Sequence, residues 1–316
     1  MDIAIATLSS PVILFFILGM AAAFARSDLT IPEAMAKGLS IYLMVAIGLK
    51  GGVAVSKSGF TPDLAAAAAA GVALSFALPF LAFAILTRFA RIDRVNAGAV
   101  AAHYGSVSVV TFVTAVEILE RQALAPAGYM VAVLALMETP AIITGLLLSR
   151  GGEHDGPGGL WHEVLLNASV VLLIGSFVIG LATGAEGFAS TAPLFDGLFR
   201  GLLCLFLLDM GLVAGRRLIE TRALTARAAA SAILLPIVNG AIGTVIGTAI
   251  GLGTGSAAAL GILAASASYI AVPAAMRLAL PKADPGLSLS MSLGVTFPFN
   301  IIAGIPLFTM LARAMG

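Results

Sequence analysis

Charged residues are scarce in this chain of 316 residues, where Asp, Glu, Lys and Arg together make up 10%. A soluble domain carries about 25% charged residues, so most side chains here must face lipid or one another. The net charge is only +1, and no basic cluster indicates a nucleic-acid partner. The single cysteine, Cys204, excludes an intramolecular disulfide and a thiolate metal cluster.

Motifs of soluble catalysis are also missing. The chain has no glycine-rich phosphate loop, no dinucleotide fingerprint and no His or Cys spacing typical of a metal site. Of the three histidines, only His103 lies inside an apolar stretch. An intramembrane hydrolase would need a nucleophile paired with a base, and no motif links a serine to His103. The sequence therefore predicts no enzymatic activity.

Apolar residues dominate the chain. They make up 60% of it, and the mean hydropathy is +1.07. A lipid core of ~30 Å is crossed by about 20 apolar residues of helix, so we predict an all-α membrane protein with ten transmembrane helices. The first apolar stretch lacks a basic leader and is predicted to be retained as a span. The ten predicted spans are 3–26, 31–55, 62–88, 95–120, 126–149, 161–183, 193–218, 223–252, 256–279 and 285–314.

Basic residues fall unevenly at the ends of these spans. Cytoplasmic ends are enriched in Lys and Arg, which predicts an inner-membrane protein with both termini outside, in the periplasm. In this orientation the outside ends clearly hold only Lys57, Arg121 and Arg313. The inside ends hold Arg26, Arg88, Arg91, Arg94, Arg150, Arg216, Arg217, Arg222, Arg227, Arg277 and Lys282.

The two halves share the motif acid-x3-base-Gly-Leu-x8-Gly-Leu-x2-Gly, which begins at Glu33 and again at Asp196. We therefore predict a first five-helix repeat over residues 1–150, a short cytoplasmic linker over 151–160 and a second repeat over 161–316. Five spans is an odd number, so the second repeat must enter the membrane inverted. Inverted repeats are typical of alternating-access transporters. The alternative is an old duplication without a transport role.

Small polar residues interrupt the fourth and ninth predicted spans, at residues 103–111 (HYGSVSVVT) and 265–273 (ASASYIAVP). Both stretches occupy the fourth span of their repeat. If both unwind at the membrane centre, two helix N-termini face one pocket, where N–H and hydroxyl donors suit a small oxyanion. The alternative is that small residues simply let these helices pack closely.

Ionisable groups inside spans are costly and are therefore functional candidates. The clearest is Glu138, which could bind a sodium ion or form a hydrogen bond or ion pair that fixes packing. Lys50 and Asp209 are further candidates, and Asn300 is an uncharged candidate in the matching part of the tenth span. His103 could carry protons or donate a hydrogen bond within the packing.

Taken together, these motifs resemble the sodium-dependent bicarbonate transporter family, first known from cyanobacteria. The similarity is collinear and runs from about residue 31 to 310. It is carried by Ile31-Pro32-Glu33-Ala34, Gly105-x-Val107-Ser108-x2-Thr111, Glu138-Thr139-Pro140-Ala141, Ser266-x-Ser268, Pro273, Arg277, Pro281, Ala283, Pro285, Pro298 and Ile305-Pro306-Leu307-Phe308.

The resemblance implies a core domain and a gate domain, with broken crossing helices at spans four and nine. It also implies sodium as the coupling ion, a homotrimer, and a partner resembling the PII signalling proteins on the cytoplasmic face. Tyr269 stands where cyanobacterial members carry an Asp, so it can supply a hydroxyl but no charge. Matching positions assign Gly105, Val107, Ser108, Ser266 and Ser268 to the substrate, and Thr111 and Glu138 to sodium. We add Ser106 and Ala267, which lie in the same stretches, to the predicted substrate site, and Tyr269 and Asn300 to the predicted sodium site.

We therefore expect a secondary active transporter in the lipid bilayer that takes up bicarbonate with sodium by alternating access. One alternative is a sodium- or proton-coupled carrier of another small anion or organic acid. A passive channel would need a continuous polar pore, which these spans do not offer. The remaining alternative is a PII-partnered membrane sensor, which would bind ligand without moving it.

Overall fold

The computed structural model describes residues 11–59, 61–150, 168–220, 224–269 and 271–316, and within these ranges it contains helices and no strand. The predicted all-helical class is confirmed for this part of the chain. The predicted linker, the start of the sixth predicted span and residues 3–10 lie outside the described residues.

The α-helices and π-helical segments (η) are α2 Pro11–Phe24, α3 Glu33–Ser58, α4 Pro62–Arg88, α5 Arg94–Gly105, α6 Val109–Arg121, α7 Met130–Leu136, α8 Glu138–Arg150, α10 Ala168–Ala189, η1 Pro193–Gly197, α11 Phe199–Glu220, α12 Ala226–Ala249, α13 Thr254–Ala265, α14 Ala271–Ala279, α15 Pro285–Leu289, η2 Ser290–Thr296, α16 Phe297–Phe299, η3 Asn300–Gly304 and α17 Ile305–Met315.

Six helical stretches in the described residues are long and apolar enough to cross a membrane. Their outward side chains are apolar too: Phe80 of α4 is 55% exposed and Leu147 of α8 is 66% exposed. Large exposed apolar faces suit contact with lipid rather than water. The six stretches are Glu33–Lys57, Pro62–Arg88, Arg94–Arg121, Met130–Ser149, Ala226–Ala249 and Pro285–Met315.

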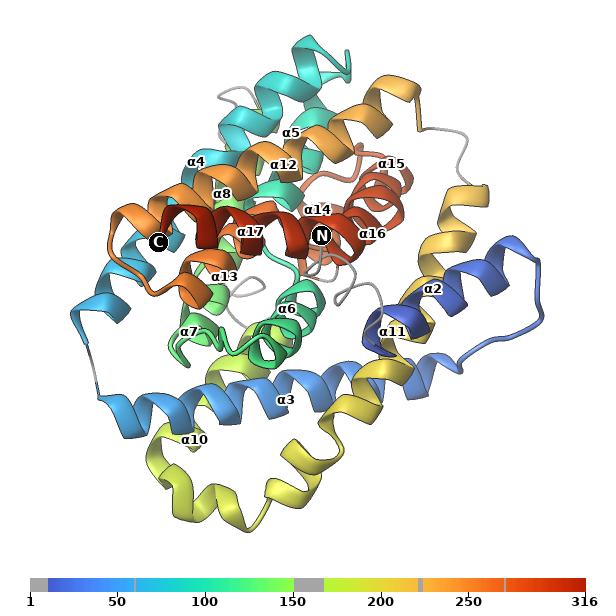
Figure 1. Ribbon diagram of the computed structural model, residues 1–316. Coiled ribbons are helices and arrows are strands. Elements are labelled where there is room, and N and C mark those ends of the chain that lie inside the picture. Colours follow the sequence, from blue (N-terminus) through green and yellow to red (C-terminus); the bar gives the residue numbers. More distant parts are fainter. Residues whose placement is uncertain (1–10, 60, 151–167, 221–223, 270) are drawn as a thin grey trace.

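Two helix pairs, α2 with α11 and α3 with α10, each join the first half of the chain to the second (Figure 1). Both contacts depend on glycines. A Cβ atom on Gly52 would lie 2.0 Å from the Phe177 carbonyl oxygen, and one on Gly211 would lie 2.1 Å from that of Phe16. These two glycines of the shared motif thus let backbones meet in the second and seventh predicted spans.

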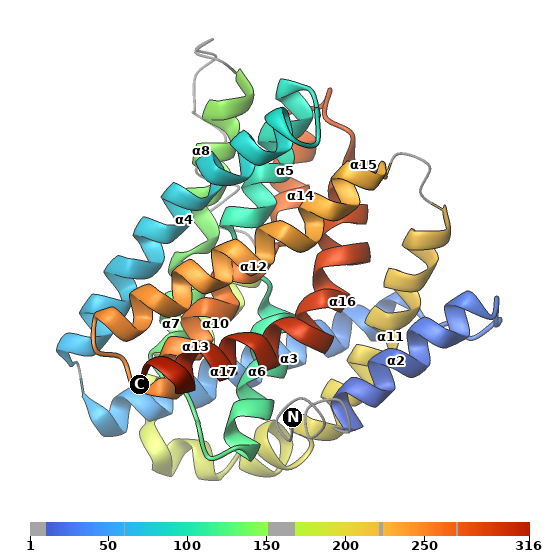
Figure 2. The ribbon, with the colours of Figure 1, turned by 45° about the horizontal axis from the view of Figure 1, so that its top comes forward.

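A second group of helices lies to one side of these pairs. Here α4 and α8 pack on α5, while α13 packs on α12. Figure 2 shows α4 and α12 running beside each other, and they are also in contact. By position these are the third spans of the two predicted repeats. Each carries a proline in its interior, Pro79 in α4 and Pro236 in α12.

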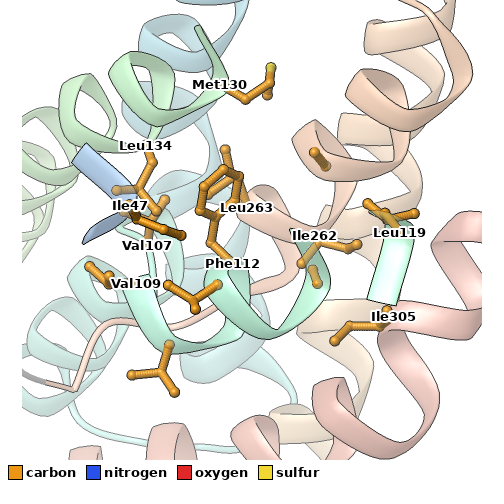
Figure 3. Close-up of a cluster of buried hydrophobic side chains, with 14 of the residues drawn as sticks. Ile47, Val107, Val109, Phe112, Leu119, Met130, Leu134, Ile262, Leu263 and Ile305 are labelled. Carbon is orange, nitrogen blue, oxygen red and sulfur yellow. The ribbon is translucent and has the colours of Figure 1, made fainter. Parts of the chain in front are cut away.

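The main hydrophobic core connects the two groups of helices. Phe112 of α6 belongs to one buried cluster with Leu134 of α7 and Leu263 of α13. Ile47 of α3 and Ile305 of α17 belong to the same cluster (Figure 3). α6 is the element that follows the first polar stretch, so this packing fixes where its N-terminus points.

Candidate functional site: two crossing helix interruptions

The first polar stretch interrupts the helix between α5, which ends at Gly105, and α6, which begins at Val109. Ser106 is extended, with φ −88° and ψ −178°. The Ser108 hydroxyl caps α6 by accepting the Thr111 backbone N–H at 3.2 Å. The first amides of a helix have no partner within it, and those of Val109 and Val110 gain none from other described residues.

The second polar stretch has the same construction. α13 ends at Ala265 and α14 begins at Ala271. Ser266 is extended, with φ −76° and ψ 161°, and the Ser268 hydroxyl accepts the Val272 backbone N–H at 3.4 Å. In both stretches, therefore, a Ser-x-Ser segment leaves one helix and caps the next.

The two interruptions are hydrogen-bonded to each other. The backbone N–H of Ser108 donates to the Ser266 hydroxyl at 2.9 Å, and the backbone N–H of Ser268 donates to the His103 carbonyl at 2.9 Å. The His103 ring adds a third bond, because Nδ1 donates to the Ser268 carbonyl at 2.5 Å. All four residues are buried. The structure thus brings together two polar segments that lie far apart in the chain.

The two first serines of these segments differ in one respect. The Ser266 hydroxyl donates to the Leu263 carbonyl at 2.8 Å and accepts the Ser108 amide, so it is fully engaged. The Ser106 hydroxyl occupies the equivalent position, is buried, and has no hydrogen-bond partner in the described structure. Buried polar groups are nearly always paired. Of these two serines, Ser106 therefore has the hydroxyl that remains available to a ligand.

Two asparagines support the helix ends that precede the interruptions. The Asn239 side-chain NH2 donates to the Tyr104 carbonyl at 3.3 Å, and that of Asn300 donates to the Ala265 carbonyl at 2.9 Å. Both amide oxygens are buried without a partner among the described residues. Sequence reasoning had named Asn300 and missed Asn239, although an amide three residues after Pro236 in an apolar helix was a usable signal.

The helix of the fifth predicted span is interrupted as well. α7 ends at Leu136 and α8 begins at Glu138. Ser75 of α4 accounts for the break, because its hydroxyl donates to the Met137 carbonyl and accepts the Ala141 N–H at 3.1 Å. A side chain thus replaces one bond of the helix ladder. Pro140 removes the neighbouring bond, since it has no N–H.

Glu138 lies at this interruption with a side chain that is 3% exposed. Its Oε2 atom has no hydrogen-bond partner, and no basic group of the described residues forms an ion pair with it. The described part of the chain therefore contains no partner with which Glu138 could form a packing ion pair. A buried carboxylate without a partner is strongly unfavourable, so this site suits a cation.

The other predicted sodium ligands are distributed around Ser108 and Ala265. The Thr111 hydroxyl donates to the Ser108 hydroxyl at 3.0 Å. The Tyr269 hydroxyl is buried and interacts with the Ser108 side chain without regular hydrogen-bond geometry. No hydrogen bond in the described structure joins Glu138 to Thr111, Tyr269 or Asn300.

A charged cluster lies away from the interruptions. Lys50 of α3 pairs with Asp196, the acid of the second repeat motif, at 2.9 Å. Glu117 of α6 is 2% exposed and pairs with both Arg200 of α11 at 2.7 Å and Arg121 of α6 at 2.8 Å. Sequence reasoning missed Glu117, because an acid near the end of a predicted span passes for an exposed residue.

Comparison with known proteins supports this interpretation at the family level. A search of curated proteins gave no match. The family model of the Na+-dependent bicarbonate transporter superfamily matches residues 11–313, nearly the whole chain. This match confirms the resemblance found in the sequence, and it agrees with the predicted absence of enzymatic activity. The chain is thus a multi-pass membrane transporter that belongs to the Na+-dependent bicarbonate transporter superfamily.

Proposed function

We propose that the protein is a secondary active transporter that takes up bicarbonate together with sodium. The observation that carries the proposal is the hydrogen-bonded crossing of the two Ser-x-Ser segments, since interrupted helices meeting inside a membrane are a common architecture of transport sites. The family description names both the sodium dependence and the anion.

The anion is assigned to the donors that face the crossing. α6 directs the free amides of Val109 and Val110 and the positive end of its dipole toward the interruption. The Ser106 hydroxyl adds a donor without a partner. Gly105, Val107 and the second segment, with Ser266, Ala267 and Ser268, shape and brace this site.

Sodium is assigned to Glu138, whose buried Oε2 atom has no partner in the described structure. Sodium, like calcium and magnesium, is a hard cation that prefers oxygen ligands. The free amide oxygen of Asn300 and the hydroxyls of Thr111 and Tyr269 offer such ligands at the crossing. We propose that sodium enters first and neutralises Glu138, after which the anion binds to a site with lower electrostatic repulsion.

The domain organisation of the proposal follows the sequence prediction. Residues 1–150 and 161–316 are inverted repeats of five spans, joined by 151–160, with both termini in the periplasm of an inner-membrane protein. The core contains the two interrupted spans, and the gate contains the pairs α2–α11 and α3–α10. A homotrimer and a PII-like partner on the cytoplasmic face remain predictions from the family resemblance.

Uptake into proteoliposomes tests the proposal directly. We expect radiolabelled bicarbonate to accumulate when sodium is high outside, to saturate with concentration, and to stop when the sodium gradient is removed. Uptake driven by a proton gradient instead, or uptake of another small anion only, would favour a related carrier. Ligand binding without uptake in a folded preparation would indicate a sensor.

The ion pair between Glu117 and Arg200 gives a second test, because it joins α6 of the proposed core to α11 of the proposed gate. If the core moves against the gate, this pair must open in each cycle. Arg200 is 59% exposed, so its loss should change the balance of conformations by ~1 kcal/mol or less. We expect Arg200→Gln to change the uptake rate by up to about fivefold.

Arg121→Gln is the matched control for this prediction. Arg121 pairs with the same carboxylate oxygen but lies on the same helix as Glu117, so its loss does not disconnect core from gate. We expect its uptake rate to stay within about twofold of the wild type. Equal effects of the two substitutions would contradict a role for the pair in gating.

A further inference from the structure

His103 has a fixed hydrogen-bonding role on one side of its ring. A carbonyl oxygen can only accept a hydrogen bond, so the contact with the Ser268 carbonyl requires Nδ1 of His103 to carry the proton. In a neutral ring the other nitrogen, Nε2, is then an acceptor. The ring is 1% exposed and stands two residues before Gly105, where α5 ends.

The same ring lines a pocket between α5 and α14. The lining includes Pro281, which lies in an exposed turn, and His103, which lies two residues before the end of α5. The other polar side chain in the lining, Ser288, already donates to the Asp284 carbonyl at 3.4 Å. The remaining lining is apolar and includes Ala99, Pro273, Met276 and Leu280. His103 is therefore the main polar group that the pocket offers to a solute.

The last turn of α5 and the start of α6 together carry two kinds of hydrogen-bonding group. Donors come from the amides of Val109 and Val110 and from the Ser106 hydroxyl. An acceptor comes from Nε2 of His103. Bicarbonate can pair with both kinds of group, because its charged oxygens accept hydrogen bonds while its O–H group donates one. Nitrate has the same planar shape and charge but no donor, so a nitrate oxygen at Nε2 would face a lone pair.

We propose that His103 determines specificity by accepting a hydrogen bond from a singly protonated oxyanion, which excludes anions of the same shape without a donor. This inference rests on the proposed function and names the substrate class of its anion site. Sites built to pair a polar group of the substrate reject analogues that lack it, because a buried partner is then left unpaired. The bond to Ser268 selects the tautomer and thereby keeps Nε2 free to accept.

The substitution His103→Asn tests this role. An asparagine amide can place its N–H near the position of Nδ1 and so retain the bond to Ser268, but it leaves nothing at the position of Nε2. We expect wild-type bicarbonate uptake to resist excess nitrate. In the variant we expect the ratio of nitrate inhibition constant to bicarbonate KM to fall at least about tenfold. Ser288→Ala, in the same pocket, should leave this ratio within about twofold.

A binding measurement on the wild type tests the inference even if the variant does not fold. Bicarbonate should raise the melting temperature in detergent, and nitrate at the same concentration should not. Wild-type binding of nitrate as tight as that of bicarbonate, or an unchanged ratio in a folded His103→Asn variant, would overturn the inference alone. Absence of any bicarbonate binding or uptake by the wild type would overturn the proposed function and the inference with it.

Discussion

Replacing Glu138 with alanine should abolish sodium-driven uptake while the protein remains folded. The carboxylate is buried, and its Oε2 atom has no partner in the described structure. Without sodium, this group therefore contributes repulsion or unfavourable desolvation rather than stability. Its removal takes away the single negative charge proposed to hold the ion. We expect uptake at a fixed sodium gradient to fall at least about tenfold, since charge-assisted contacts contribute ~1.5–3 kcal/mol.

A thermal shift measurement separates this role from a structural one. A ligand that binds only the folded state stabilises it by about 2.7 kcal/mol at a concentration 100 times its Kd. Wild-type protein in detergent should therefore melt at a higher temperature in sodium than in a large organic cation. The Glu138→Ala variant should melt at the same temperature in both salts.

Glu138→Gln and Asp209→Asn are the matched controls. Glutamine keeps the size of the side chain but not its charge, so it should also lose the sodium response. Asp209 is another buried intramembrane acid, and it lies in α11, outside the crossing. Its asparagine variant should retain the sodium response. If sodium raises the melting temperature of Glu138→Ala as much as that of the wild type, Glu138 serves in packing rather than in sodium binding.

Gly105→Ala should both destabilise the protein and impair transport. A Cβ atom on Gly105 would lie 2.3 Å from Cγ and 2.5 Å from Cδ of Pro79, and 3.0 Å from Cβ of Ala141. Pro79 is a rigid ring inside α4, so it cannot rotate away. Overpacking of this kind destabilises a protein by roughly 1–3 kcal/mol. The strain would be relieved by displacing the end of α5, which moves Ser106 away from the crossing.

Gly201→Ala is the control for this substitution. Gly201 lies in α11, and no other described part of the chain comes within 4 Å of the position of its Cβ, apart from the backbone of α11 itself and the neighbouring residues. Alanine favours a helix over glycine by up to about 1 kcal/mol, so this variant should melt at the same temperature or slightly higher. Thermal unfolding in detergent and sodium-driven uptake would be measured for both variants. Equal melting temperatures would show that α4 and α5 can separate without loss.

The sequence alone supported the helical membrane class and several particular positions. Low charge and long apolar runs allow few structures other than packed helices in lipid. The shared motif marked Gly52 and Gly211, and in the structure both permit close helix contacts. The two Ser-x-Ser segments were singled out because hydroxyls and small residues are uncommon inside apolar spans, and both interrupt a helix in the structure.

Helix continuity was less predictable. The fifth span contains Pro140, but the structure breaks the helix at Met137, three residues earlier. The cause lies on another helix, since the Ser75 hydroxyl takes up the carbonyl of Met137 and the amide of Ala141. A proline can be detected in a sequence, but the side chain that satisfies the groups around it cannot.

What the sequence determined by itself was composition, periodicity and the positions of unusual residues, because these are local properties of the chain. Only the tertiary structure decided which polar groups meet. It paired the Ser108 amide with Ser266, His103 with Ser268, and thereby left the Ser106 hydroxyl free. Ser106 and Ser266, the first serines of the two segments, look equivalent in the sequence. Their hydrogen-bond partners differ because those partners come from distant segments, whose approach is set by the packing of whole helices.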